Sequence, residues 1–486
     1  MLFNSYEFLF FFLPITLIVF FLLGGRGATV AASAWLAVAS VGFYAYWNWK
    51  HAPIVLGSIA VNYLIGSRLS RNAGKAPGLL AFGVIANLLL LGICKYRGFV
   101  IENLNALLHT SWVVPPQVLP LGVSFFTFTQ IAFLVDAHRG GAQHYPGLRY
   151  GLFVLFFPHL IAGPIVHHHQ LIPQLGRREI FRFQPGPFAV GLTLFVIGLA
   201  KKVIFADTLA TFAKPVFASA AGGDTPGFYA AWGGALGYTL QLYFDFSGYS
   251  DMALGLARMF DVKFPANFNS PYKATSIIEF WRRWHITLSN FLRDYLYFPL
   301  GGSRCGKARH YINLFITMLL GGIWHGAGWT FIIWGAWHGA ALCVNHAWRA
   351  LRGAGKDAQP ATFSGRLFAG AITFLVIVIG WVFFKAANVP AALRILRGMT
   401  HVTAFSPAEA VGALRQIVWI AALLPVVWLA PNSQQLLAAH GPALHEVSAS
   451  RWNWQPTARW ALCLVIVFVL TMLHLSQISE FIYFQF

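Results

Sequence analysis

His325 is the residue of this sequence whose type and setting point most directly to chemistry. It stands in the tripeptide Trp324-His325-Gly326, inside an otherwise apolar segment at residues 311–348. An ionisable side chain at bilayer depth is costly and suggests a function, and an uncharged imidazole can accept a proton as a general base. The tripeptide recurs at Trp337-His338-Gly339, so spacing alone does not rank the two histidines.

A second histidine, His285, lies in a segment that is predicted to be a continuous helix. Ser276 and Glu279 fit a capping box, and the helix that they open is expected to end just before Pro299. His285 falls on or beside the aromatic stripe of this helix. It is therefore either a hydrogen-bonded packing residue or a member of the same site as His325.

Two carboxylates occur close together in an apolar part of the chain. The context of Asp245 and Asp251 is intramembrane or interfacial, where a carboxylate usually pairs with a cation or lines a polar cavity. Both interpretations stay open from the sequence: a structural ion pair, or a role in binding substrate.

Three consecutive histidines at residues 167–169, with His159 nearby, raise the question of a metal site. Consecutive residues of a helix point in different directions, so this run does not by itself place three ligands around one ion. The four cysteines are widely separated and form neither a zinc motif nor a disulfide framework. We therefore expect no metal and no permanently bound cofactor.

The elements that position these residues must be membrane helices. The chain has 486 residues, of which 57% are hydrophobic and 10% charged, and this leaves too few charges to solvate a globular surface. Its apolar runs are long and continuous, which favours helices over a barrel because backbone polar groups in hydrocarbon need partners within the segment. We predict an all-α integral membrane protein with about eleven to thirteen membrane helices.

The expected organisation is a single polytopic membrane domain over residues 1–486. Stretches rich in Gly and Pro at residues 162–164 and 267–271 predict broken or re-entrant helices, which survive at membrane depth only when they are buried in protein or line a wet cavity. Residues 119–348 are therefore the predicted catalytic core. Flanking membrane helices are expected on both sides, in residues 1–118 and 349–486.

The net charge of +19 arises from 34 Lys and Arg against 15 Asp and Glu. Either the orientation bias of membrane loops or the attraction of an acidic partner explains such a balance, and orientation is the default. The short loop with Arg68, Arg71 and Lys75 is basic and is predicted to be cytoplasmic, which places the N-terminus outside. We expect no nucleic-acid partner.

Several long motifs, in the right order and spread over most of the chain, resemble the membrane-bound O-acyltransferase family. The resemblance is closest to its bacterial branch, which includes the membrane subunit of alginate O-acetyltransferase. The motifs are LFNSYEFLF at residues 2–10, FPHLIAGPI at 157–165, DFSGYSDMA at 245–253, FPANFNSPY at 264–272, EFWRRWHITLS at 279–289, RDYLY at 293–297 and GIWHG at 322–326.

This resemblance implies a ring of transmembrane and re-entrant helices around a central funnel or tunnel. It identifies His325 as the essential histidine, above His338, and His285 as the second polar position. We expect His325 to act as general base and His285 to orient the acyl group or the acceptor. The candidate substrate-binding residues around them are Trp281, Arg282, Trp284, Ser289, Trp324, Asp245, Asp251 and Asn267.

The resemblance also implies a donor, an acceptor and a partner. The donor is a cytoplasmic acyl thioester such as acetyl-CoA, and the final acceptor is an exported polysaccharide such as alginate. The sequence contains no Gly-x-Ser-x-Gly nucleophile elbow, so we expect a separate periplasmic partner with a serine-esterase nucleophile. The expected location is the bacterial inner membrane, where the chain crosses the lipid bilayer several times and has a periplasmic N-terminus.

Two kinds of alternative stay open. Within the enzyme class, the chain could serve peptidoglycan O-acetylation or the D-alanylation of teichoic acid. In another class, a transporter or flippase would also explain buried histidines, aspartates and broken helices. The absence of repeated halves in the sequence argues against transport.

Overall fold

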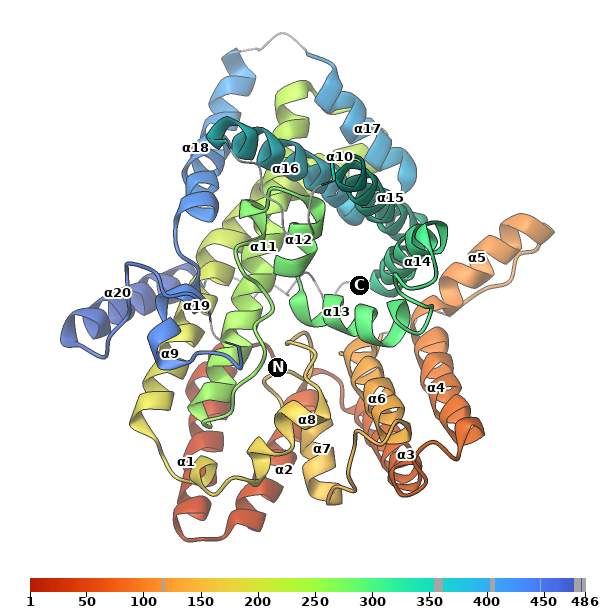
Figure 1. The fold of residues 1–486 in the computed structure, drawn as a ribbon. Helices are drawn as coiled ribbons and strands as arrows, with labels where there is room; N and C mark the ends of the chain where they lie inside the picture. Colours follow the sequence, from red (N-terminus) through yellow and green to blue (C-terminus); the bar gives the residue numbers. More distant parts are fainter. Residues whose placement is uncertain (116–118, 354–361, 403–406, 446, 476–481, 483–486) are drawn as a thin grey trace. The chain divides into compact units, whose positions relative to one another are not determined.

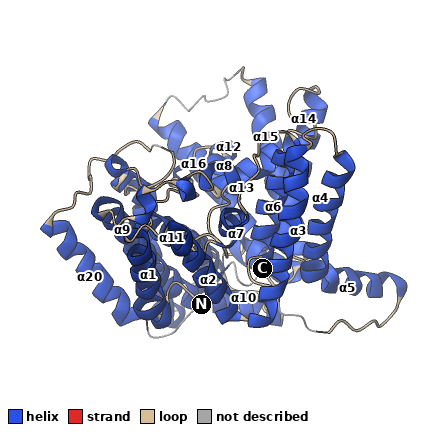
Figure 2. Ribbon diagram, turned by 90° about the horizontal axis from the view of Figure 1, so that it is seen from below, coloured by secondary structure: helices blue, strands red, loops and turns tan. Residues whose placement is uncertain are grey.

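The structure is a computed structural model of the whole chain, and it describes all residues except 116–118, 354–361, 403–406, 446, 476–481 and 483–486. Within these described ranges every regular element is a helix and none is a strand, as Figure 2 shows by colour. The prediction of an all-α fold is confirmed.

Long apolar helices dominate the described part of the chain. Six helical stretches there are long and apolar enough to cross a membrane: Phe8–Gly25, Thr29–Trp47, Trp49–Arg71, Pro77–Leu108, Pro185–Gly222 and Phe363–Lys385. Two shorter apolar helices, Leu414–Leu429 and Ala458–His474, accompany them. The chain is a multi-pass membrane protein, because stretches of this length and hydropathy match the thickness of a bilayer's hydrocarbon core.

The chain forms two compact units. Unit 1 contains Met1–Ala200, Tyr249–Ala266 and Ser433–Gln485, and unit 2 contains Lys201–Gly248 and Asn267–Asn432. One long helix, α11 (Phe228–Met259), contributes residues to both. The predicted division into a catalytic core at residues 119–348 and two flanking regions stays a prediction.

Unit 1 consists of helices from both ends of the chain. Its α-helices are α1 (Leu13–Gly25), α2 (Thr29–Trp47), α3 (Ala52–Arg71), α4 (Pro77–Leu91), α5 (Arg97–Leu108), α6 (Val123–His138), α7 (Gly147–Leu155), α8 (His168–Leu171), α9 (Pro185–Ala200), α19 (Ser433–Leu436) and α20 (Ala458–His474). Short π and 3-10 segments join them at Phe8–Phe12, Trp49–His51, Gly92–Tyr96, Gln174–Gly176, Glu179–Phe181 and Ala438–His440.

Helix α6 is fixed in unit 1 by its neighbours α3 and α4, which lie side by side with it in Figure 1. The apolar run at residues 150–166 behaves differently. Helix α7 ends at Leu155, and residues 156–167 form no regular helix. This run is therefore no simple crossing, and the broken backbone predicted for residues 162–164 is confirmed.

Unit 2 holds both candidate histidines. Its α-helices are α10 (Asp207–Gly222), the larger part of α11, α12 (Ile277–Arg283), α13 (Ile286–Leu292), α14 (Lys307–His325), α15 (Trp329–Leu351), α16 (Phe363–Lys385), α17 (Val389–Thr400) and α18 (Pro407–Leu429). Short π and 3-10 segments lie at Lys201–Ala206, Pro271–Lys273 and Arg293–Tyr297.

Helices α14 and α15 form a closely packed hairpin (Figure 1). The close approach requires glycine, because a Cβ on Gly322 would lie 2.9 Å from the Cα of Gly335 and would also collide with the carbonyl oxygen of Phe331. Three residues separate the two helices, and the backbone is extended at Gly326 and Gly328. The hairpin thus presents the end of α14 at a sharp break in the chain.

The continuous helix predicted across His285 is wrong. Ser276 does cap α12, since its Oγ accepts a hydrogen bond from the backbone N–H of Glu279 at 3.2 Å. The helix then ends at Arg283, and a new one begins at Ile286. His285 sits at the break with a positive φ of 43°, a backbone conformation that costs a non-glycine residue about 1–2 kcal/mol and must be held by specific contacts.

Candidate active site

His325 is the last residue of α14 and is buried among aromatic rings. Its ring centroid lies 4.9 Å from Trp324, 4.9 Å from Trp334 and 5.2 Å from Phe384. The last two pairs are close to perpendicular, with interplanar angles of 85° and 74°. The ring of His325 is thus enclosed by aromatic side chains from α14, α15 and α16.

His285 is fully buried and is positioned by Asn267. The Nδ1 of His285 lies 3.0 Å from the Oδ1 of Asn267. The same oxygen accepts from the hydroxyl of Thr287 at 3.0 Å and from its backbone N–H at 3.3 Å, and the carbonyl oxygen of Asn267 accepts from the N–H of Ile286 at 3.0 Å. One asparagine thus holds the strained turn and the imidazole together.

These contacts assign the tautomer of His285. Because the Oδ1 of Asn267 accepts from Thr287, it also acts as acceptor toward His285, so the proton of a neutral ring lies on Nδ1. The lone pair then lies on Nε2. The ring is set edge-on to Phe246, at 4.7 Å and 89°.

Trp324 connects the two candidate histidines. Its indole lies 4.9 Å from the ring of His325 and 6.5 Å from the ring of His285, centroid to centroid. Residues that are forty positions apart in the chain, on α14 and at the α12–α13 break, thus contact one side chain within unit 2. This arrangement brings together His285, Asn267, Trp324 and His325 from the predicted set.

His338 belongs to the same aromatic region. Its ring lies 4.9 Å from Trp334, the indole that also contacts His325, and 5.2 Å from Trp281. In the part of the chain that the structure describes, neither ring nitrogen of His338 has a hydrogen-bond partner. The structure therefore does not by itself decide the predicted ranking of His325 above His338.

The predicted tryptophans Trp281, in α12, and Trp284, directly after α12, pack against this region. Trp284 is buried and stacks at 5.6 Å and 20° on Phe280, with Trp381 at 4.9 Å. Trp281 lies edge-on to Trp334 at 5.8 Å and 73°. Trp281 and Trp284 thus belong to an aromatic wall, the group of packed rings from α12 to α16 that surrounds the histidines.

Arg282 lies in α12 and Ser289 lies in α13, but neither packs among the aromatic rings. Arg282 is exposed on α12. The hydroxyl of Ser289 donates to the backbone carbonyl of Trp284 at 3.4 Å, and its N–H donates to the carbonyl of His285 at 3.0 Å. Ser289 therefore supports the chain break, whereas Arg282 lies outside the aromatic wall.

Asp245 is buried in unit 2 and forms an ion pair with Lys202, whose Nζ lies 2.7 Å from its Oδ1. The same Nζ is 2.9 Å from the Oδ1 of Asp207. This is the structural pairing that the sequence left open as one of two interpretations. Lys202 was not singled out from the sequence, although a lysine in an apolar run near an aspartate is a signal that could have identified the pair.

Asp251 belongs to unit 1, whereas the histidines belong to unit 2. Its carboxylate accepts from the hydroxyl of Ser433 at 2.8 and 2.7 Å and from the amide of Gln434 at 3.3 Å. These contacts join α11 to the start of α19. They give Asp251 a structural partner within its own unit.

Sequence reasoning missed the side chains that enclose His325. Trp334 and Phe384 come from α15 and α16. In the sequence nothing distinguishes them from the many other aromatic residues of the chain. Sequence reasoning also missed Asp136, whose carboxylate lies near all three histidines of the run at residues 167–169. The expectation that no metal is bound stays untested.

Comparisons with known proteins address the family. The family model of the membrane-bound O-acyltransferases matches residues 95–387. The peptidoglycan O-acetyltransferase of Helicobacter pylori is 38% identical, over 100% of this chain and 98% of that protein. The probable alginate O-acetylase AlgI of Pseudomonas aeruginosa is 39% identical over 100% of both chains. A teichoic acid D-alanyltransferase of Streptococcus thermophilus is 25% identical over 62% of this chain and 79% of its own length.

The matched region includes His285, His325 and the aromatic wall between α12 and α16. Both full-length relatives exceed the identity at which common descent is plain, and the resemblance seen in the motifs is confirmed. The chain belongs to the membrane-bound O-acyltransferase family and is an O-acyltransferase.

Proposed function

We propose that this protein transfers an acetyl group from a thioester donor, such as acetyl-CoA, to a hydroxyl acceptor, for O-acetylation of an exported polysaccharide. His325 is the general base. The observation that carries the proposal is the pair of buried histidines, His285 and His325, in contact with the same indole of Trp324.

The reaction needs little from the protein beyond one base and good positioning. The imidazole of His325 takes the proton of the acceptor hydroxyl as its oxygen attacks the thioester carbonyl carbon. The carbon–sulfur bond breaks, and the proton passes to the departing thiolate. The products are an ester and a free thiol, and no covalent acyl-enzyme is required. A positioned base contributes about 10²–10⁴-fold, and orientation and oxyanion stabilisation supply the rest.

His285 orients the acyl group or the acceptor. Its Nδ1–H is committed to Asn267, which fixes the ring plane and leaves Nε2 as the atom that faces away from this bond. Asn267 acts through His285 and is a positioning residue. The indole of Trp324, which contacts both imidazoles, is the candidate donor to the oxyanion.

The names of the relatives support a carbohydrate acceptor. Proteins called alginate O-acetylase and peptidoglycan O-acetyltransferase are both similar to the whole of this chain, and O-acetylation of an exported polymer is the activity that their names share. We propose alginate-like polysaccharide as the final acceptor, with peptidoglycan as the second candidate. D-alanylation of teichoic acid is less supported, because those relatives are 25–28% identical over 56–62% of the chain.

Under this proposal the protein lies in the bacterial inner membrane with its N-terminus in the periplasm. The donor binds from the cytoplasm, and the acetyl group is handed outward. The immediate acceptor is the serine of a separate periplasmic esterase-like partner, which then modifies the polysaccharide. No metal or permanently bound cofactor takes part in this transfer.

The test is acetyl transfer by the purified protein in proteoliposomes with labelled acetyl-CoA. Release of CoA and labelling of added partner or polysaccharide are measured for the parent protein and for His325→Ala. We expect a fall of at least about 100-fold in the variant. The control is His401→Ala, an exposed histidine of unit 2, which should retain the parental rate.

Two outcomes would overturn the proposal. If a folded His325→Ala protein transferred acetyl groups at the parental rate, His325 would not be the general base. Labelling by D-alanyl carrier protein but not by acetyl-CoA would move the chain to the teichoic acid reaction. A panel of alginate and peptidoglycan fragments, each with its partner esterase, separates the two carbohydrate acceptors.

A further inference from the structure

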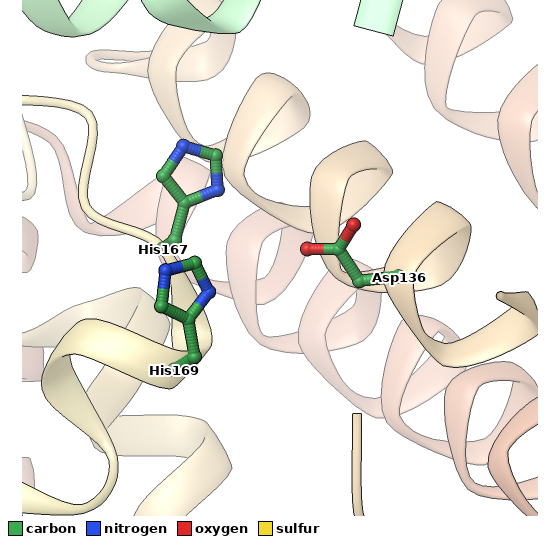
Figure 3. A group of neighbouring side chains, drawn as sticks. All are labelled: Asp136, His167 and His169. Carbon is green, nitrogen blue, oxygen red and sulfur yellow. The ribbon is translucent and has the colours of Figure 1, made fainter. Parts of the chain in front are cut away.

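A second group of histidines lies in unit 1, apart from the residues used above. Asp136 near the end of α6, His167 directly before α8 and His169 within α8 each offer one ligand atom, and these three atoms lie within 4.8 Å of one another. Figure 3 shows the two imidazoles one above the other, with the carboxylate of Asp136 pointing toward them.

The backbone explains why His167 and His169 share a side. His167 is extended, with φ −85° and ψ 151°, and only from His168 onward does the chain become helical. Residues i and i+2 across an extended position point the same way. Their rings are stacked at 5.4 Å and 21°, whereas His168 is perpendicular to His169 at 89°. The helical interpretation of the sequence places all three histidines in a helix, where they point in different directions. This interpretation is wrong for His167, which precedes the helix.

His168 holds the carboxylate of Asp136 in place through a hydrogen bond. It is buried, and its Nε2 lies 3.2 Å from the Oδ2 of Asp136, while its Nδ1 lies 2.9 Å from the hydroxyl of Tyr145. A hydrogen bond from the backbone N–H of His167 to the Oε1 of Gln170, at 3.1 Å, fixes the chain in front. Supporting contacts of this kind orient metal ligands in known sites.

The donor set fits a borderline transition-metal ion. Two imidazole nitrogens and one carboxylate oxygen are the ligands that Zn²⁺ takes in sites with three protein ligands and one open position, whereas Mg²⁺ and Ca²⁺ prefer oxygen alone. Ligand atoms around Zn²⁺ are roughly 3.5 Å apart, so the three ligand atoms, which now lie within 4.8 Å of one another, would move closer together around the ion.

We propose that Asp136, His167 and His169 form a binding site for a divalent transition-metal ion, with Zn²⁺ as the fitting member of the class. The ion would join the end of α6 to the segment that enters α8 and would stabilise unit 1. The site lies beside the predicted cytoplasmic loop, since the N–H of Gly74 donates to the carbonyl of His138 at 2.8 Å. The proposal does not depend on the acetyl transfer.

The experiment measures metal binding directly. The protein is purified in detergent through a tag without histidine and is stripped with chelator. Titration calorimetry with Zn²⁺, and the visible spectrum after Co²⁺ addition, report affinity, stoichiometry and coordination. We expect one equivalent of Zn²⁺ and a weakening of at least about 10-fold in Asp136→Asn, His167→Ala and His169→Ala. Thermal unfolding should shift upward on Zn²⁺ addition, because an ion that binds only the folded state stabilises it.

His144→Ala is the matched control, because His144 is an exposed histidine of the same unit, in the loop after α6. Its Zn²⁺ affinity should equal that of the parent. Asp136→Asn keeps the size of the side chain and guards against a variant that merely fails to fold. Absence of stoichiometric binding at micromolar Zn²⁺, or equal weakening in His144→Ala, would overturn the proposal.

Discussion

The histidines of the two units stand in opposite surroundings. In unit 2, His325 is enclosed by Trp324, Trp334 and Phe384 and is part of an aromatic wall. In unit 1, His167 and His169 face the carboxylate of Asp136 and are partly open to solvent. Aromatic surroundings suit a neutral ring that exchanges a proton, whereas a carboxylate and an open side suit a cation.

The comparison teaches that the same residue type acquires its chemistry from its neighbours. Both groups contain a histidine held by a polar side chain: Asn267 holds His285, and Asp136, together with Tyr145, holds His168. The partner is an amide in the first case and a carboxyl group in the second. The difference between these partners is therefore the feature to test.

The largest expected effect separates the two groups by function. His325→Ala should lower acetyl transfer by at least about 100-fold, because the proton acceptor is lost, and should leave Zn²⁺ affinity unchanged. Initial rates of CoA release and Zn²⁺ titration of the same preparation check both halves. His338→Ala, whose ring contacts the same Trp334, should lose less activity than His325→Ala. The reverse order would transfer the role of base to His338.

A second prediction concerns how unit 2 accommodates a carboxylate. Lys202→Met leaves Asp245 buried without its cation, which costs about 3–5 kcal/mol. The melting temperature in detergent should fall sharply. The double variant Lys202→Met/Asp245→Asn removes both charges and should recover most of the stability and the transfer rate. A double variant that folds but is inactive would contradict the structural interpretation and would instead indicate that Asp245 binds substrate.

Local composition predicted the membrane fold well. The long apolar runs of the sequence predicted membrane helices, and the first apolar run is a helical stretch over Phe8–Gly25 in the structure. Such segments are decided by their own hydropathy, so neighbours far away in the chain do not change the outcome. The capping residue Ser276 was predicted for the same reason, since its hydrogen bond to Glu279 spans one turn.

Contacts between distant segments could not be predicted. The chain break at His285 depends on Asn267, which lies eighteen residues earlier and satisfies the polar groups that the broken helix exposes. The wall around His325 depends on Phe384 from α16, and the cluster in unit 1 depends on Asp136 from α6. In each case helical periodicity gives the face of a residue but not the partner that covers it.

A third prediction tests the hairpin that carries His325. In Gly322→Ala the new Cβ meets the backbone of Phe331 and Gly335, and backbone atoms cannot rotate away. We expect a loss of about 1–3 kcal/mol in stability, with reduced transfer because the end of α14 shifts. Gly328→Ala is the control, since its Cβ would lie 3.6 Å from the ring of Phe331, an ordinary contact. Thermal unfolding of the two variants in detergent gives the comparison, and equal losses would show that the hairpin does not need close backbone contact at Gly322.

The smallest expected effect exchanges the partners of the two fixed histidines. Asn267→Asp gives His285 the kind of acid that His168 has, and Asp136→Asn gives His168 the neutral amide. In Asn267→Asp the hydrogen-bond acceptor remains but a buried charge is added, so acetyl transfer should fall by about 10-fold, which is about 1.4 kcal/mol in activation free energy. The fall should appear in kcat, because His285 loses its neutral setting while the contacts with Thr287 persist.

Asn267→Ala removes all of these contacts and should lower the melting temperature as well. If Asn267→Asp instead left kcat unchanged while Asp136→Asn also left Zn²⁺ affinity unchanged, the charge of the partner would not explain the difference between the two groups of histidines.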